Sequence, residues 1–316
     1  MVEDRSLTES NGNIRPCPMC HSTDRDLLVV SLADVLDENY PLSPVEYPYY
    51  RCKACGSSYM AQLPSPSVLA AYYESPVYLQ RVLDVAEGPN TRISWLWWLY
   101  YRITRPIPVK QPGRHLDFGC GPGQYLLFTK ACGWDCVGVE YSDASAALAR
   151  SRGLNVVLEQ HLAEMPDYSF DLITLNHSLE HVADPGATLV ALGRKLRPGG
   201  TLFIEVPSIS PLEFLVFGRY YLLGAPLHFQ VFSDESIQLL AEKAGLRLMR
   251  CMNNPWMLQY FTGSLLSFLR WKCGLRLNRK TVGLIYLTAF PLVAIPAFTL
   301  PLVGCRGVAR RYIVTR

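Results

Sequence analysis

One stretch of the chain, residues 115–140, constrains the fold more than any other. It reads HLDFGCGPGQYLLFTKACGWDCVGVE and predicts a buried strand, a glycine turn, a helix and a second strand that ends on an acid. Gly119, Gly121 and Gly123 let the backbone turn tightly and approach a ligand that a Cβ would block. Glu140, at the tip of the second strand, stands where a carboxylate accepts both hydroxyls of a ribose. The stretch therefore predicts a site for a nucleotide-type cofactor.

The spacing of the glycines distinguishes between cofactors. Dinucleotide-binding enzymes use G-x-G-x-x-G, and the turn fails in both registers because Gln124 and Leu126 stand in place of the third glycine. The run D-x-G-x-G-x-G that begins at Asp117 resembles motif I of the class I S-adenosylmethionine (SAM)-dependent methyltransferases. The resemblance implies that this loop holds the amino-acid end of the cofactor, and that Glu140 holds its ribose. The predicted cofactor-binding residues are Asp117, Gly119, Gly121, Gly123 and Glu140. A tight strand-to-helix turn without a ligand is the alternative.

Three later segments resemble the same family in the expected order. Residues 170–176 (FDLITLN) look like its fourth strand, and residues 196–206 (LRPGGTLFIEV) like its glycine turn into strand five. Residues 228–246 match its Ser-Asp-capped helix, which ends at Gly245 as a C′ glycine would. The resemblance covers residues 112–250. It implies an α/β fold, a Rossmann-like class I methyltransferase sheet with helices on both faces.

Two C-x-x-C pairs stand near the N-terminus: Cys17 with Cys20, and Cys52 with Cys55. Such pairs form tetrahedral thiolate sites, because two intervening residues let both sulfurs face one ion. We therefore expect a structural zinc ion in a zinc-ribbon-like module over residues 1–61. A metal-free remnant or a redox pair is the alternative, and His21 is a second possible ligand.

Residues 281–304 run for 24 residues without a charge, long enough to span a hydrocarbon core. Both flanks are basic, and Pro291, Pro296 and Pro301 break any straight helix. Two basic ends and a broken centre favour a re-entrant hairpin or monotopic insertion over a single crossing. We therefore expect residues 251–316 to be a hydrophobic, membrane-associating C-terminal region with a helical segment. A buried helix or an oligomer interface is the alternative.

Residues 62–111 form the expected helical connector or lid between the ribbon and the sheet. Within it, residues 93–103 (ISWLWWLYYRI) are apolar nearly all round and are flanked by arginines. Tryptophan and tyrosine with basic ends suit a membrane interface. A helix packed under the sheet, or one that forms part of a substrate lid, is the alternative.

Composition restricts the partners and the compartment. A net charge of +3 is too small to indicate nucleic acid, and no basic stretch is interleaved with aromatic residues. The first residues are polar and include acids, so they predict neither a secretory signal nor a transit peptide. We expect the catalytic part to lie in the cytosol, at the cytoplasmic face of a membrane.

Methyl transfer from a sulfonium is an in-line displacement, so the protein positions donor and acceptor and removes a proton from a hydroxyl acceptor. Asn176 ends the fourth strand, where the cofactor's methyl group is expected. His181 and His228 are the candidate bases, and either can instead be a packed structural residue. His177 and Glu180 precede His181 in a segment that resembles the E-x-x-E-H cation site of ubiquinone-pathway O-methyltransferases. His177 replaces the first glutamate, which argues against a catalytic metal. Residues 160–164 contain no clear acid for the adenine.

The combined prediction is a membrane-associated methyltransferase that methylates oxygen on a glycan, a lipid-linked sugar or an isoprenoid-type acceptor. The membrane segment is what indicates an amphiphilic acceptor. A soluble nucleotide-sugar methyltransferase is the first alternative. A non-catalytic SAM-binding membrane scaffold is the second, and the complete cofactor motif argues against it.

Overall fold

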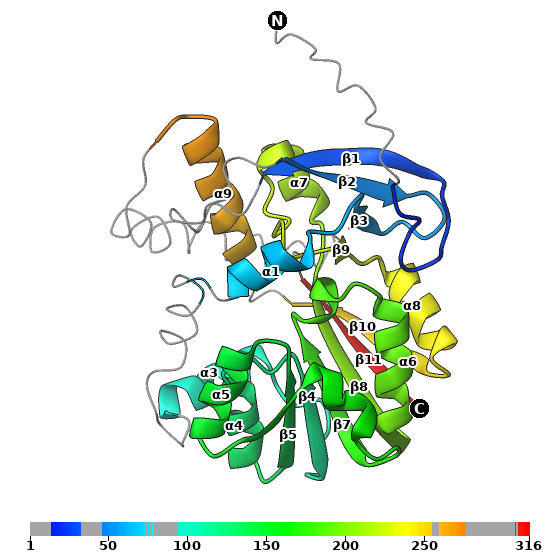
Figure 1. Ribbon diagram of the computed structural model, residues 1–316, viewed down its shortest axis with the longest axis vertical. Coiled ribbons are helices and arrows are strands. Elements are labelled where there is room, and N and C mark those ends of the chain that lie inside the picture. Colours follow the sequence, from blue (N-terminus) through cyan, green and yellow to red (C-terminus); the bar gives the residue numbers. More distant parts are fainter. Residues whose placement is uncertain are drawn as a thin grey trace, which may run out of the picture.

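The computed structural model describes residues 14–32, 46–73, 75, 78, 94–254, 259–275, 307 and 309–316. A seven-stranded sheet forms the larger part of these residues (Figure 1). Its strands are β4 (Arg114–Phe118), β5 (Asp135–Glu140), β6 (Asn155–Leu158), β7 (Phe170–Asn176), β8 (Leu196–Pro207), β10 (Arg247–Asn253) and β11 (Ala309–Thr315). They lie in the order β10-β11-β8-β7-β4-β5-β6. The predicted α/β fold is confirmed.

Helices cover the sheet on both sides. Figure 1 shows one group beside β4 and β5: α3 (Trp95–Thr104), α4 (Gln124–Ala131) and α5 (Asp143–Ser151). The other group, α6 (Pro185–Lys195) and α8 (Asp234–Lys243), lies beside β8 and β10. The strands β4 to β8 are parallel, and their inward positions are fully buried, as for Leu172, Ile173 and Leu175 on β7. Burial on both faces explains why these strands are apolar runs.

Local signals set the helix ends as the sequence predicted. Ser233 begins α8 with a capping box, in which its hydroxyl accepts from the Ser236 N–H. Gly245 follows that helix with φ of 70°, a conformation that a glycine adopts without cost. Asp184 caps α6 in the same way, by accepting from the Ala187 N–H. Ser233 and Asp184 thus mark where α8 and α6 begin, and Gly245 marks where α8 ends.

The sheet extends beyond residue 250, where the sequence had placed the end of the domain. β11 runs antiparallel between β8 and β10, with Tyr312 paired to Ile204 on one side and to Cys251 on the other. Tyr312 and Val314 are fully buried, so residues 309–315 belong to the core of the sheet and not to a membrane-associating region. The apolar residues 281–304 lie outside the described residues. Within the described ranges, we find no helix with the length and apolar character that a membrane crossing requires.

A four-stranded sheet stands above the first (Figure 1). Its strands are β1 (Arg25–Leu32), β2 (Glu46–Cys52), β3 (Ser58–Met60) and β9 (Gln230–Val231), in that order. Nearby in the same view are α1 (Pro66–Tyr73), α7 (Pro211–Phe217) and α9 (Gln259–Trp271). Because β9 comes from the middle of the chain, the N-terminal module is joined to the larger domain through a shared sheet. The described residues also contain three short 3₁₀ helices: η1 (Glu159–Glu164), η2 (Leu179–His181) and η3 (Gly218–Tyr220).

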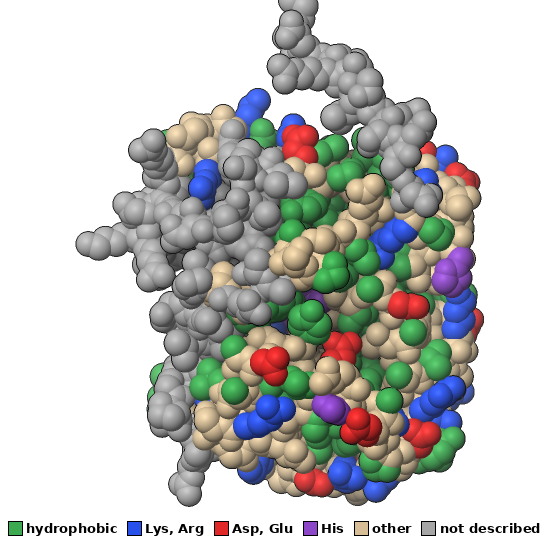
Figure 2. All heavy atoms as spheres, in the orientation of Figure 1, with side chains coloured by type: hydrophobic (Ala, Val, Ile, Leu, Met, Phe, Trp, Pro, Cys, Tyr) green, Lys and Arg blue, Asp and Glu red, His purple; other side chains and the backbone are tan. Residues whose placement is uncertain are grey.

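The aromatic helix α3 has two faces. Tyr101 packs against Tyr125 and Phe128 of α4, so one face is part of the core. The other face leaves Trp95 71% exposed and Leu96 61% exposed. The helix therefore packs beside the sheet, and it also presents apolar side chains to the surface. On the face drawn in Figure 2, charged side chains of both signs are interspersed over the lower half, in keeping with the small net charge.

Candidate functional site

The glycine turn after β4 has the backbone shape that the sequence predicted. Gly119, Gly121 and Gly123 have φ of 74°, 55° and 86°, a region that other residues seldom adopt. A Cβ on Gly119 would lie 2.5 Å from the Cβ of Ser178, whereas a Cβ on Gly121 would meet nothing within 4 Å. Gly119 is therefore required for packing, and Gly121 faces open space that a ligand can approach.

Glu140 connects the end of β5 to this turn. Its Oε2 accepts a hydrogen bond from the Gly121 N–H at 2.7 Å, and its Oε1 accepts from the N–H groups of Tyr141 and Ser142 at 2.9 Å each. Burial raises the pKa of Glu140, while the three N–H donors favour its ionised form. The carboxylate is thus held at the edge of the glycine turn.

Asp117 and Asn176 lie beneath the turn. The Oδ1 of Asp117 accepts from the Thr174 hydroxyl at 2.6 Å and from the Asn176 amide at 3.3 Å. Asp117 is 2% exposed, and this burial raises the pKa of its carboxyl to about 7. Asn176, predicted to lie near the reacting group, is thus placed as a partner of Asp117.

A cavity of about 570 Å³ opens at the carboxyl ends of β4, β5 and β7. The cofactor residues Gly119, Gly121 and Glu140 line it, and so do His177 and His181. Apolar side chains complete its wall: Leu69, Val139, Val182, Leu227 and Phe229. The predicted cofactor turn and one predicted base therefore share a single cavity.

Residues of the connector also reach this cavity. Tyr73, at the end of α1, and Tyr78 contribute to its wall. The Tyr78 hydroxyl lies 3.1 Å from the Ser145 hydroxyl of α5, and the rings of Tyr73 and Tyr141 are 5.3 Å apart. The connector thus forms part of the wall of the cavity.

His177 is held between two buried carboxylates. Its Nδ1 lies 3.3 Å from Oε1 of Glu180, and its Nε2 lies 3.1 Å from Oε1 of Glu205 on β8. Burial lowers the pKa of His177, but the two carboxylates raise it further, so its pKa lies above the usual value. His177 has φ of 54°, which is uncommon for a residue with a Cβ.

His181 and His228, the two predicted bases, lie side by side with ring centres 4.8 Å apart. The Nδ1 of His181 is 3.0 Å from the Leu227 carbonyl, and since a carbonyl oxygen only accepts, Nδ1 carries the hydrogen. Nε2 is then the basic nitrogen. Burial lowers the pKa of His181, against the charge of Glu180, so the ring is neutral at pH 7.

The two rings differ in their access to the cavity. His181 is part of its wall, whereas His228 is not among the described lining residues. His228 stands behind His181, with Nε2 4.0 Å from Oε1 of Glu180, and burial lowers its pKa to about 3. Of the two predicted bases, His181 is therefore the one that a ligand in the cavity can contact.

Glu180 is fully buried among these rings, and its pKa is lowered because the neighbouring histidines outweigh the effect of burial. One ligand atom from each of Glu180, His181 and His228 lies within 4.8 Å of the others. His177, on which the argument against a catalytic metal rested, is not in this group. The group combines a carboxylate with two imidazoles, and of these three residues only His181 lines the cavity.

Glu159 is a site residue that the sequence did not reveal. It begins η1 directly after β6, and its side chain lines the cavity. Burial raises its pKa, and the nearby charge of Glu140 adds to this. The available signal was its position, since Glu140 and Glu159 each stand at the carboxyl end of a parallel strand. Glu159 lies one residue before residues 160–164, the range in which the family resemblance places an acid that contacts the adenine.

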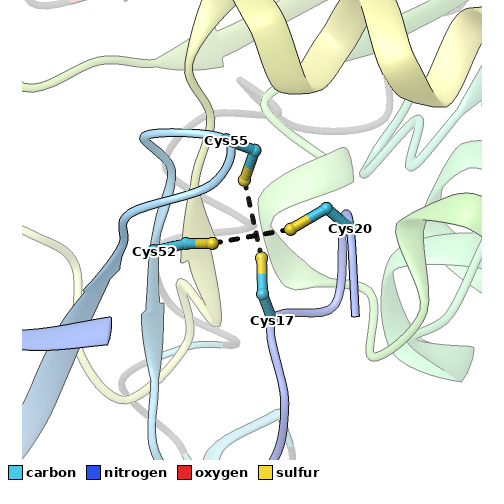
Figure 3. Close-up of side chains that lie close together, drawn as sticks. All are labelled: Cys17, Cys20, Cys52 and Cys55. Atoms are coloured by element: carbon cyan, nitrogen blue, oxygen red, sulfur yellow. Dashed lines mark hydrogen bonds between the residues drawn. The ribbon is translucent and has the colours of Figure 1, made fainter. Parts of the chain in front are cut away.

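The four N-terminal cysteines converge in space (Figure 3). The Sγ atoms of Cys17 and Cys55 are 3.6 Å apart, and those of Cys20 and Cys52 are 3.5 Å apart. All four lie within 4.8 Å of one another. A tetrahedron with zinc–sulfur bonds of about 2.3 Å has edges of about 3.8 Å, so this arrangement fits a zinc ion. His21, the alternative ligand, is exposed and is not part of the cluster.

Comparison with known families identifies the central domain. Residues 101–250 match the family model described as Methyltransferase domain. This part of the chain is a methyltransferase domain. Its mixed seven-stranded sheet has the architecture of class I methyltransferases. The match includes the glycine turn and the histidine cluster, and it leaves out the cysteine module and β11.

Curated relatives of the methyltransferase domain are named Ubiquinone biosynthesis O-methyltransferase. That of Hahella chejuensis is 33% identical over 123 residues, which are 35% of this chain and 52% of the relative. That of Aeromonas salmonicida is 30% identical over 149 residues, 42% of this chain and 62% of the relative. The chain thus spans between half and two thirds of the length of these relatives.

Among solved structures, the chain is similar to a phosphoethanolamine N-methyltransferase 2 of Haemonchus contortus in complex with SAM. The TM-score is 0.49 at 15% identity, over 82% of this chain and 61% of that one. A SAM-dependent methyltransferase of Archaeoglobus fulgidus gives a TM-score of 0.45 at 18% identity, over 70% of this chain and 93% of that one.

Proposed function

We propose that the chain is a SAM-dependent methyltransferase that methylates a hydroxyl oxygen of a small molecule. The observation that carries this proposal is the single cavity lined by Gly121 and Glu140 and also by His181. The name of the curated relatives, Ubiquinone biosynthesis O-methyltransferase, supports oxygen as the methylated atom.

The cofactor half of the cavity suits SAM. The open space at Gly121 admits a ligand close to the backbone, and the carboxylates of Glu140 and Glu159 face the cavity as acceptors for its hydroxyl and amino groups. When bound, SAM supplies a methyl group activated by a sulfonium. Tyr73 and Tyr78 add aromatic side chains to the wall beside Glu140.

His181 then acts as the general base. A hydroxyl acceptor must lose its proton as the new bond forms, and a neutral imidazole with a free Nε2 can take it. The hydrogen bond from Nδ1 to the Leu227 carbonyl keeps the ring in this tautomer. The charge of Glu180 stabilises the imidazolium that results.

We further propose an amphiphilic acceptor, such as a glycan, a lipid-linked sugar or an isoprenoid-type molecule, taken from the cytoplasmic face of a membrane. The apolar wall of the cavity, which includes Leu69, Leu227 and Phe229, supports an acceptor with an apolar part. The exposed Trp95 and Leu96 on α3 support contact with a lipid surface, as does the charge-free run of residues 281–304.

We also propose that Cys17, Cys20, Cys52 and Cys55 hold one zinc ion. With four thiolate ligands, the ion has no open position for chemistry, so its role is structural. It would fix the two C-x-x-C turns that precede β1 and β3.

Calorimetric titration of SAM and S-adenosylhomocysteine tests the cofactor site. We expect micromolar binding to the wild type and at least tenfold weaker binding to both variants. Gly121→Arg fills part of the cavity with a side chain, and Glu140→Ala removes the carboxylate from its wall. Gly153→Arg is the matched control, because Gly153 also has a positive φ and open space but lies outside the cavity. A folded wild type that binds neither compound would refute the proposal.

A second experiment tests the acceptor class once cofactor binding is established. Labelled methyl groups are transferred from SAM to membrane lipid extracts, with His181→Gln as the inactive comparison.

A further inference from the structure

The cysteine module and the methyltransferase domain meet at the histidine cluster. β3 of the module pairs with β9, where Ser58 lies opposite Val231 and Tyr59 opposite Gln230. β9 begins two residues after His228, so the module forms hydrogen bonds with the backbone that carries this histidine. The shared sheet is therefore part of the site.

Two further contacts fix the backbone on this side. Tyr49, on β2, is fully buried, and its hydroxyl donates to the carbonyl of His228 at 2.5 Å. The Met60 N–H donates to the carbonyl of Phe229 at 2.9 Å. β2 ends at Cys52, so the strand that positions Tyr49 is anchored by a cysteine of the cluster. The carbonyls of residues 228 and 229 are thus both held by the module.

Arg15 links the module to two segments of the cavity wall. It lies two residues before Cys17, and its guanidinium donates to the carbonyls of Met60 at 3.0 Å, Phe229 at 3.1 Å and Ala183 at 3.4 Å. One side chain therefore joins β3, the segment after His228 and the segment after His181.

The segment that the module holds, residues 227–230, in turn holds His181. The Leu227 carbonyl accepts from Nδ1 of His181. The Phe229 N–H donates to the Glu180 carbonyl at 2.8 Å. The buried side chain of Gln230 donates to the carbonyls of Leu179 at 3.1 Å and Val182 at 2.7 Å. The position and the tautomer of His181 therefore depend on residues 227–230.

We propose that the cysteine module orients the base of the methyltransferase: Tyr49 and Arg15 are positioning residues that fix residues 227–230 and, through them, His181. The inference rests on the proposed function only in treating His181 as the base. The cofactor residues Gly121 and Glu140 take no part in these contacts. The module therefore acts on proton removal and leaves cofactor binding unaffected.

The test uses the metal-loaded full chain with Tyr49→Phe, which removes the hydroxyl and keeps the ring. Tyr50→Phe is the matched control, because it changes the next residue of β2, which is partly exposed. Ring ¹⁵N signals of His181 report its tautomer, and amide hydrogen exchange reports on Met60 and Phe229. In Tyr49→Phe we expect a mixture of His181 tautomers and at least tenfold faster exchange of these two amides. In Tyr50→Phe we expect the wild-type tautomer and exchange. The Kd of S-adenosylhomocysteine stays within twofold in both.

The tautomer separates positioning from a general loss of stability, because a globally destabilised protein keeps its native signals at temperatures well below its Tm. A Tyr49→Phe protein that retains a pure Nδ1–H tautomer and wild-type exchange would overturn the inference. If Tyr49→Phe does not fold, Arg15→Met is measured with the same two outcomes. Absence of S-adenosylhomocysteine binding by the wild type would refute the proposed function, while the His181 signals would still decide the inference.

Discussion

Arg311 on β11 and Glu205 on β8 form a buried ion pair that connects the last strand of the sheet to the histidine cluster. The Nε of Arg311 contacts Oε2 of Glu205, and Oε1 of Glu205 bonds to His177 at 3.1 Å. Glu205 is fully buried, so its charge depends on these partners and on Arg105, whose Nε lies 3.4 Å from Oε1. The pair thus links β11, in the interior of the sheet, to His177 in the wall of the cavity.

We expect Arg311→Met to lower the free energy of unfolding by about 3 kcal/mol, because it leaves a buried carboxylate with fewer partners. The control is Arg197→Met, which breaks a partly exposed pair with Asp171 and is expected to cost less than about 1 kcal/mol. Urea unfolding measures both. Equal effects of the two variants would show that the buried pair does not stabilise the sheet.

Gly119→Ala is expected to destabilise the fold more than Gly153→Ala. The two glycines have nearly the same φ, 74° and 76°, so each alanine costs about 1 to 2 kcal/mol of backbone strain. Only at Gly119 does the new Cβ meet another atom, the Cβ of Ser178 at 2.5 Å, which adds about 1 to 3 kcal/mol. The double variant Gly119→Ala/Ser178→Gly removes that contact and should recover part of the loss in urea unfolding. If the double variant recovers no stability, the whole loss comes from the backbone strain at residue 119.

His115 gives the stability a specific pH dependence. Its ring is fully buried between the hydroxyls of Thr129 and Thr174, and burial lowers its pKa to about 3. Between pH 6.5 and 3 the unfolded chain binds a proton at this residue and the folded chain does not, so acid favours unfolding.

The stability advantage of the wild type over His115→Gln should therefore shrink by about 1.4 kcal/mol per pH unit as the pH falls from 6 to 4. Asp117 acts in the opposite direction over this range, because burial raises its pKa to about 7, and its effect cancels in the difference between the two proteins. Urea unfolding at several pH values measures this difference. A difference that does not change with pH would mean that His115 is protonated in the folded state.

Metal analysis of the purified full chain should find about one zinc per chain. Cys52→Ser should lose the metal, because three thiolates and a hydroxyl form a much weaker site. Cys273→Ser is the control, since Cys273 is exposed and lies outside the cluster. Less than half an equivalent in the wild type would contradict the zinc proposal.

The membrane proposal predicts that the full chain sediments with vesicles that contain anionic lipids. Replacing Trp95 and Leu96 with serine should weaken this binding, because it removes apolar side chains from the exposed face of α3. Met249→Ser, at an exposed apolar position on β10, is the control. Equal sedimentation of all three proteins would exclude α3 from the contact. Truncation ahead of residue 309 is not a suitable test, because it deletes β11.

The cofactor side of the site could be predicted because its signals are local in sequence. The glycine turn, Glu140 and the capped helix after His228 each depend on a few neighbouring residues, and the structure has the predicted turn and helix. Glu159 was not predicted because it lies directly after β6, at the first residue of η1, and not within residues 160–164.

Long-range pairing could not be predicted in the same way. The residues of β11, ARRYIVT, follow a long apolar run, so their arginines suggested the basic end of a membrane segment. Only the neighbouring strands show that Arg311 pairs with Glu205. β9 has two residues, too few to show a periodicity, so its pairing with β3 has no sequence signal.

The place of β11 between β8 and β10 also has a consequence for biosynthesis. Among the described strands, β10 is at the edge of the sheet and pairs with β11, which is translated after residues 254–308. Until residue 315 has left the ribosome, β8 has a free edge and Glu205 lacks one of its arginines. A nascent chain can therefore form the glycine turn and the cysteine cluster early, but its sheet closes only after synthesis of the final strand. A stalled chain would expose the open edge of β8 to other proteins, a state that chaperones recognise.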